Sequence, residues 1–130
     1  MTYVLAGLMA TLSFLLNRVA LRYIGINAVI TCGPVLEECA KTLLAYYLGA
    51  DIFYTHVLFG AIEAGYDLVT SKHRLVAALI SIGGHSLFGL VTIMVLSVVA
   101  NIVVALISAA ILHVAGNITV IMLSHRKDDV

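Results

Sequence analysis

Several side chains that can exchange a proton lie inside long apolar stretches of the sequence. Glu37 and Glu38 are adjacent in GPVLEECAKTLLAYY, and Glu63, His85 and His113 interrupt three other apolar stretches. Carboxylates and imidazoles are common general acids and bases, and in membranes they also form proton relays. A charge at mid-bilayer costs between about 2.5 and 17 kcal/mol, so packing alone is a poor explanation for several of them. These residues are therefore candidates for one functional site.

Three of these residues are followed, four positions later, by another polar side chain: Lys41 after Glu37, Asp67 after Glu63 and Asn117 after His113. Residues four apart share one face of a helix. The spacing predicts an ion pair in which Lys41 keeps Glu37 ionised and leaves Glu38 to exchange protons. Two interpretations without a catalytic role remain open. The ion pair of Glu37 and Lys41 could only orient helices, and Asp67 could be solvated near the membrane surface.

The composition of the chain is typical of a membrane protein. Of its 130 residues, 62% are hydrophobic and 11% are charged, with a mean hydropathy of +1.12. Soluble domains carry roughly a quarter charged residues. Five apolar segments are near the roughly 20 residues that a spanning helix needs: 2–17, 27–49, 52–70, 75–99 and 102–123. We therefore expect an all-α, polytopic membrane protein in which residues 1–130 form a single transmembrane domain of about five helices.

The charged loop residues predict an orientation in the membrane. Lysines and arginines follow the first, third and fifth segments: Arg18 and Arg22, Lys72 and Arg74, Arg126 and Lys127. The links on the other side carry only Asp51 and Asn101. By the positive-inside rule, we expect an integral membrane protein with an extracytoplasmic N-terminus and a cytoplasmic C-terminus. The zero net charge gives no indication of a nucleic-acid partner.

The candidate residues are predicted to meet at one depth. At 1.5 Å per residue, Glu38, His85 and His113 each lie roughly 15 Å from the cytoplasmic side, and Glu63 about 10 Å from it. The hydrocarbon core is about 30 Å thick. Four ionisable residues from four helices therefore converge near or just below the midplane.

Four short motifs resemble those of the PrsW-type intramembrane proteases, within the superfamily of CAAX-prenyl and bacteriocin-processing proteases. EECAK, starting at Glu37, is similar to the E-E-x-x-K motif of that family, and HVAGN, starting at His113, is similar to its H-x-x-x-N motif. SIGGH, ending at His85, stands where the superfamily has F-x-x-x-H, with Ser81 in place of phenylalanine. FGAIEAGYD resembles the segment with a glutamate after small residues, which corresponds to Glu63. The motifs come in the family's order.

The resemblance implies an intramembrane peptidase whose buried glutamate activates water. Glu38, or its neighbour Glu37, would be the general base, and we favour Glu38 because Glu37 is better placed to pair with Lys41. His113 would share the water or protonate the leaving amine. The resemblance gives His85 and Asn117 the role of oxyanion donors. It leaves Lys41, Glu63 and Asp67 as supporting residues, with Glu63 orienting a histidine.

A metal-dependent site competes with this interpretation. Glu38, His85 and His113 could hold zinc with one open position, although the sequence contains no H-E-x-x-H helix. We favour a site without metal or other cofactor. The expected partners are the lipid bilayer and a membrane protein or lipidated peptide as substrate, and formation of a homo-oligomer is left open.

Two functions from other classes fit the same residues. A small proton- or ion-coupled carrier would also bury Glu, His and Asp, but carriers more often show an inverted repeat and broken helices. A catalytically inactive membrane scaffold could retain the motifs as well. Cleavage of membrane-anchored peptides would separate the peptidase from both.

Overall fold

A computed structural model describes residues 1–24 and 32–128, and within these ranges every regular element is a helix. The all-α prediction is therefore confirmed. The helices in chain order are α1 (Thr2–Ile24), α3 (Cys32–Glu38), the π-helical turn η1 (Cys39–Leu43), α4 (Leu44–Leu48), α5 (Ile52–Thr70), α6 (Arg74–Val99) and α7 (Ile102–Asp128). The elements α3, η1 and α4 follow one another without interruption from Cys32 to Leu48.

The helices follow the five predicted segments, with different borders. α1 continues past residue 17 to Ile24, and α7 continues past residue 123 to Asp128. The predicted second segment began at residue 27, but residues 27–31 lie outside the described part of the chain, so its helix is followed from Cys32.

In the described part of the chain, three helical segments are long and apolar enough to cross a membrane: Thr2–Ala20, Arg74–Val99 and Ile102–Met122. The remaining helical segments carry more of the ionisable residues, with Glu63 and Asp67 on α5 and three charged side chains between Cys32 and Leu48. Large apolar side chains such as Val98 on α6 and Ile111 on α7 are exposed on the outside of the bundle. An apolar exterior around polar interior residues is the distribution that a bilayer favours.

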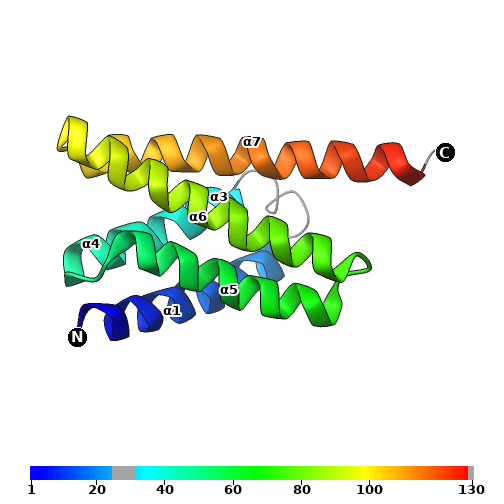
Figure 1. The fold of residues 1–130 in the computed structure, drawn as a ribbon, viewed down its shortest axis with the longest axis horizontal. Helices are drawn as coiled ribbons and strands as arrows, with labels where there is room; N and C mark the ends of the chain where they lie inside the picture. The colour runs from blue at the N-terminus through cyan, green and yellow to red at the C-terminus, as the bar shows by residue number, and fades with distance from the viewer. Residues whose placement is uncertain (25–31, 129–130) are drawn as a thin grey trace.

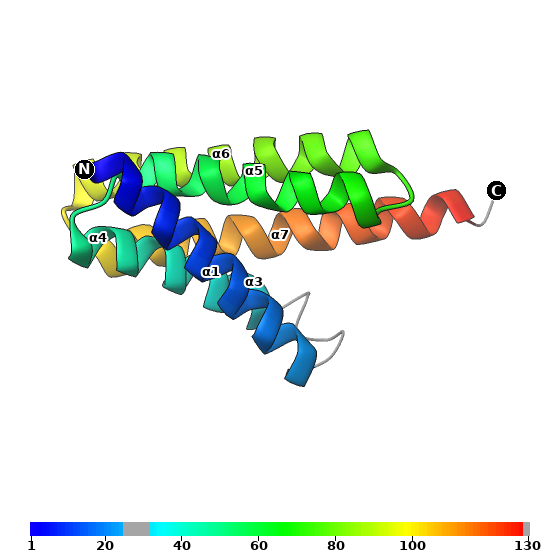
Figure 2. The ribbon, with the colours of Figure 1, turned by 90° about the horizontal axis from the view of Figure 1, so that it is seen from below.

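Helices α5, α6 and α7 run antiparallel in turn, and the links before and between them alternate between two opposite ends of the bundle. Figures 1 and 2 place the N-terminus at the same end as the α4–α5 and α6–α7 links, and the α5–α6 turn with the C-terminal end of α7 at the other end. Gly49 and Ala100, with φ of 70° and 51°, end α4 and α6 in the left-handed conformation. Asp51 begins α5 by accepting a hydrogen bond from the backbone N–H of Tyr54.

Two glycines bring α5 and α6 close together. A Cβ at Gly60 would lie 2.9 Å from the backbone oxygen of Ser81 and 3.0 Å from Cβ of His85. A Cβ at Gly89 would lie 2.7 Å from Cβ of His56. Because the helices are antiparallel, each helix places a histidine against a glycine of the other. This close contact positions both histidines at the buried site.

Candidate active site

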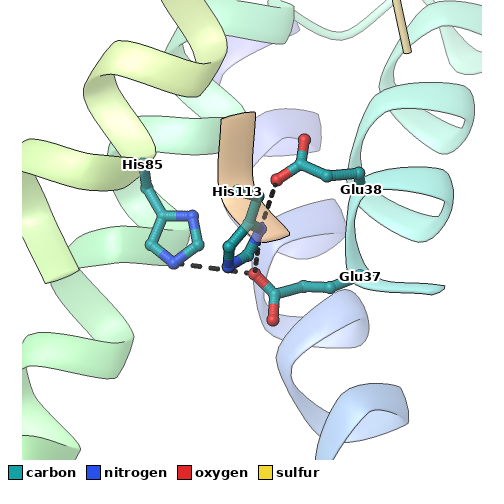
Figure 3. A group of neighbouring side chains, drawn as sticks. All are labelled: Glu37, Glu38, His85 and His113. Atoms are coloured by element: carbon teal, nitrogen blue, oxygen red, sulfur yellow. Dashed lines mark hydrogen bonds and ion pairs between the residues drawn. The ribbon is translucent and has the colours of Figure 1, made fainter. Parts of the chain in front are cut away.

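A cluster of buried ionisable side chains lies where α3, η1, α6 and α7 meet. Glu37 and Glu38 end α3, Lys41 lies in η1, and His85 and His113 come from α6 and α7. All five are buried, and Glu38 and Lys41 have no exposed surface. Figure 3 shows both imidazole rings facing Glu37, with Glu38 in contact with His113. The structure thus brings together residues that are far apart in the sequence.

The ammonium group of Lys41 is the centre of this cluster. Its Nζ lies 2.7 Å from Oε1 of Glu38, 3.2 Å from Oε1 of Glu37 and 2.8 Å from Nδ1 of His85. An ammonium group has three protons and no acceptor, so these neighbours use its whole donor capacity. The expected contact with Glu37 is present, but Lys41 does not serve Glu37 alone, because its contact with Glu38 is shorter. The π-helical turn contains this lysine, and such turns are frequent at functional sites.

The tautomer of His113 follows from its contact with Glu38. Nδ1 of His113 lies 2.9 Å from Oε1 of Glu38. An ionised carboxylate only accepts hydrogen bonds, so Nδ1 must carry the proton, and a neutral ring then has a free electron pair on Nε2. Glu38 is therefore placed to orient His113 and to leave its second nitrogen as an acceptor.

His85 has the opposite tautomer. Its Nδ1 accepts a hydrogen bond from the ammonium group of Lys41, so the proton of the neutral ring is on Nε2. Nε2 donates to Oε2 of Glu63 at 2.7 Å and lies 3.6 Å from Oε1 of Glu37. This is the arrangement expected of Glu63 as the partner that orients a histidine. The only N–H of His85 is already bonded, which does not favour the expected role of His85 as an oxyanion donor.

A cavity of about 680 Å³ opens beside the cluster. Residues of α1, α3, α5, α6 and α7 line it, and the polar ones are Asn17, Glu37, Glu63, Asp67, Ser81, His85, His113, Asn117 and Thr119. Asp67 accepts a hydrogen bond from the hydroxyl group of Ser81 at 2.7 Å. Within the described residues, Glu37 lines the cavity and Glu38 does not. A molecule in the cavity would therefore meet Glu37, contrary to our preference for Glu38 as the base.

Two residues of the cluster were missed in the sequence. Nδ2 of Asn17 donates to Oε2 of Glu37 at 2.7 Å, which makes α1 part of the site. His56 of α5 is completely buried, 3.0 Å from Oγ1 of Thr42 and 3.8 Å from Oε2 of Glu38. In the sequence, Asn17 marks only the border of the first apolar segment. The sequence could have identified His56, because it lies seven residues before Glu63 and residues at that spacing share a helix face.

Four residues offer a possible set of metal ligands. Ligand atoms of Glu37, Glu38, His85 and His113 all lie within 4.8 Å of one another. However, Lys41 bonds to both carboxylates and to His85, so a zinc ion would compete for the same acceptors and lie beside a buried positive charge. In this arrangement the residues do not fit a zinc ion together with Lys41.

The chain matches no protein-family model, no curated protein and no solved structure. A function must therefore be inferred from the arrangement of the cluster and its cavity.

Proposed function

We propose that the protein is an intramembrane peptidase, related to the PrsW-type proteases, in which Glu37 is the general base. The observation that carries the proposal is the position of Glu37. Its carboxylate lines the cavity together with His113 and Asn117, while Asn17 holds its Oε2 and Lys41 contacts its Oε1. A base must reach the water that it deprotonates, and Glu38, behind the cavity wall, is not placed to do so.

Each step of peptide hydrolysis has a candidate group in the cluster. Glu37 takes a proton from a water molecule, and the resulting hydroxide attacks the carbonyl carbon of the substrate. The amide N–H of Asn117, which lines the cavity, donates to the oxyanion. Breakage of the C–N bond then releases the amine, which takes the proton held by Glu37. His113 accepts a hydrogen bond from the water through Nε2.

Lys41, Glu38 and Glu63 support this reaction by binding other side chains of the cluster, and neither Lys41 nor Glu38 is among the residues that line the cavity. Lys41 balances the two adjacent carboxylates, Glu38 fixes the proton of His113 on Nδ1, and Glu63 binds the N–H of His85. In this scheme His85 is a positioning residue, and no step requires a metal ion. Chelating agents should therefore leave cleavage unchanged, and activity restored specifically by zinc would contradict this part of the proposal.

The proposed setting is a bundle of five spanning segments. The three long apolar helices are joined by α5 and by the segment from Cys32 to Leu48, whose charged groups face the interior cluster. The end of the bundle with the α5–α6 turn would be cytoplasmic, because Lys72 and Arg74 lie there. The substrate would be a membrane-anchored or membrane-adjacent protein segment, or a lipidated peptide.

The test is cleavage of a panel of single-span and lipidated peptides by the purified protein in liposomes, followed by mass spectrometry. Glu37→Gln keeps the shape of the side chain but removes the base, so it should abolish cleavage. Ser86→Ala is the matched control, because within the described residues this hydroxyl group on α6 bonds only to the carbonyl of Ile82 in its own helix. Undiminished cleavage by Glu37→Gln would overturn the assignment. Proton flux without cleavage would instead favour the proton-coupled carrier.

A further inference from the structure

His56 is a buried polar side chain for which the proposed reaction has no use. It lies one turn after the start of α5 at Ile52, has no exposed surface and does not line the cavity. Its Nε2 contacts Oγ1 of Thr42 and lies near Oε2 of Glu38. Burial of an imidazole among apolar helices is costly unless it is hydrogen-bonded, so its position requires an explanation.

The contacts of His56 decide which nitrogen carries its proton. Nε2 faces Oγ1 of Thr42 at 3.0 Å and Oε2 of Glu38 at 3.8 Å, whereas Nδ1 has no hydrogen-bond partner within the described residues. An electron pair on Nε2 would face a negative carboxylate, and an N–H at Nδ1 would be buried without an acceptor. A proton on Nε2 avoids both problems. The N–H of His56 is therefore directed at Thr42 and Glu38.

The two oxygens of the Glu38 carboxylate have different numbers of partners. The N–H of His56 lies near the oxygen that has fewer. Oε1 binds both Lys41 and His113, while Oε2 is buried without a hydrogen bond in the described structure. The terminal torsion of a glutamate is broad, so two contacts on one oxygen leave the carboxylate plane poorly fixed. The positive N–H of His56 next to Oε2 restricts this rotation by electrostatic attraction.

The packing of α6 keeps His56 in this position. A Cβ at residue 89 would lie 2.7 Å from Cβ and 3.0 Å from Cγ of His56. Glycine at this position therefore allows α6 to pack closely against His56. The same arrangement recurs one turn along, where Gly60 of α5 contacts His85, a residue of the proposed site. The two histidines are thus packed in the same way, each against a glycine of the neighbouring helix.

We infer that His56 is a positioning residue for Glu38 and, through Glu38, for His113. Its N–H holds the carboxylate so that Oε1 stays on Nδ1 of His113, which keeps the electron pair of His113 on Nε2. The consequence for catalysis depends on the proposed peptidase function, but the consequence for the tautomer of His113 does not. The two can therefore be measured separately.

The first measurement needs no substrate. Heteronuclear NMR of the imidazole nitrogens in detergent micelles distinguishes the two neutral tautomers, and His113→Asn assigns the signal. The intact protein should show His113 protonated on Nδ1, and His56→Phe, which keeps a ring but has no N–H, should give a mixture of tautomers. An unchanged His113 signal in folded His56→Phe would overturn the inference.

A second pair of variants covers the case in which His56→Phe does not fold. His56→Gln can place an amide N–H near the position of Nε2, whereas His56→Asn is too short to do so. We expect His56→Gln to retain the tautomer of His113 and His56→Asn to lose it. If these two variants were indistinguishable, the N–H of His56 would not position Glu38.

The second measurement uses the cleavage assay. Loss of an outer contact that orients a functional residue lowers activity about 10- to 100-fold in metal sites, and we expect a loss of this order here. His56→Asn should therefore lower kcat by about this factor, with KM changed less than about twofold, because His56 does not touch the cavity. A lower kcat with an unchanged tautomer would contradict the inference, whereas a changed tautomer with no cleavage by any form would contradict only the proposed function.

Discussion

Nδ1 of His113 lies 2.9 Å from Oε1 of Glu38, although the two residues are 75 positions apart in the chain. The contact joins α7 to α3 and assigns the two adjacent glutamates to different environments. Glu37 lines the cavity, whereas Glu38 accepts a hydrogen bond from Nδ1 of His113. In the proposed peptidase, the first glutamate acts on water and the second determines which nitrogen of His113 is free.

Glu38 and His113 should therefore act as one unit. Once Glu38→Ala has released the imidazole, His113→Ala should remove little further activity. The double variant should cleave the substrate at nearly the rate of the slower single variant, as for other residues that act together. The measurement is a double-mutant cycle on kcat/KM. Losses that multiply as for independent sites would rule out the shared role.

Asn17 should affect the chemical step although it lies on α1. Asn17→Leu removes the hydrogen bond to Oε2 of Glu37, so the carboxylate can turn away from the cavity. We expect kcat to fall by about tenfold or more with a much smaller change in KM. Thr11→Val is the control on the same helix, because the hydroxyl group of Thr11 is exposed and bonds only to its own helix at Gly7. Equal effects of the two variants would mean that α1 acts only through folding.

Lys41→Met should be among the most destabilising single substitutions. It leaves two adjacent buried carboxylates without their shared cation, and breaking a buried ion pair costs about 3–5 kcal/mol. Adding Glu38→Gln removes one of these charges and should recover part of the loss. Thermal unfolding in detergent compares the two proteins. If the double variant were as unstable as Lys41→Met or less stable, the contact with Glu38 would not be what holds the lysine.

Gly89→Ala should destabilise the packing of α5 against α6. The added methyl group would lie 2.7 Å from Cβ of His56, and overpacking of this kind costs about 1–3 kcal/mol. Gly83→Ala on the same helix meets no atom within 4 Å, so it should be neutral or gain up to about 1 kcal/mol from helix propensity. Unfolding temperatures of the two variants make the comparison. Similar behaviour would show that α6 can move away from His56 at little cost.

The proposed orientation can be tested on intact cells. A single cysteine at Lys72, in a background without Cys32 and Cys39, should be protected from a membrane-impermeant thiol reagent added outside. A cysteine at Asn101, in the link at the opposite end of the bundle, should be labelled. Reversed labelling would invert the proposed topology.

Part of this description was determined by the sequence itself. Apolar segments of nearly spanning length separated by short links specify antiparallel helices, because each long apolar run must be buried or face lipid and a short link must reverse the chain. Residues four apart lie on one face through helix geometry alone, so Glu37 with Lys41 and Glu63 with Asp67 could be placed without a structure.

The tertiary structure decided which neighbours these groups have. Helix geometry places Lys41 within reach of Glu37 and Glu38, but the distances to both depend on the π-helical turn and on the position of His85 in α6. The contact of Asn17 with Glu37 joins α1 to α3, and the close approach at Gly89 joins α6 to His56, so both depend on how separate helices pack. A sequence lists the groups that can exchange protons, whereas the packing of helices determines the partner of each group and therefore its chemical role.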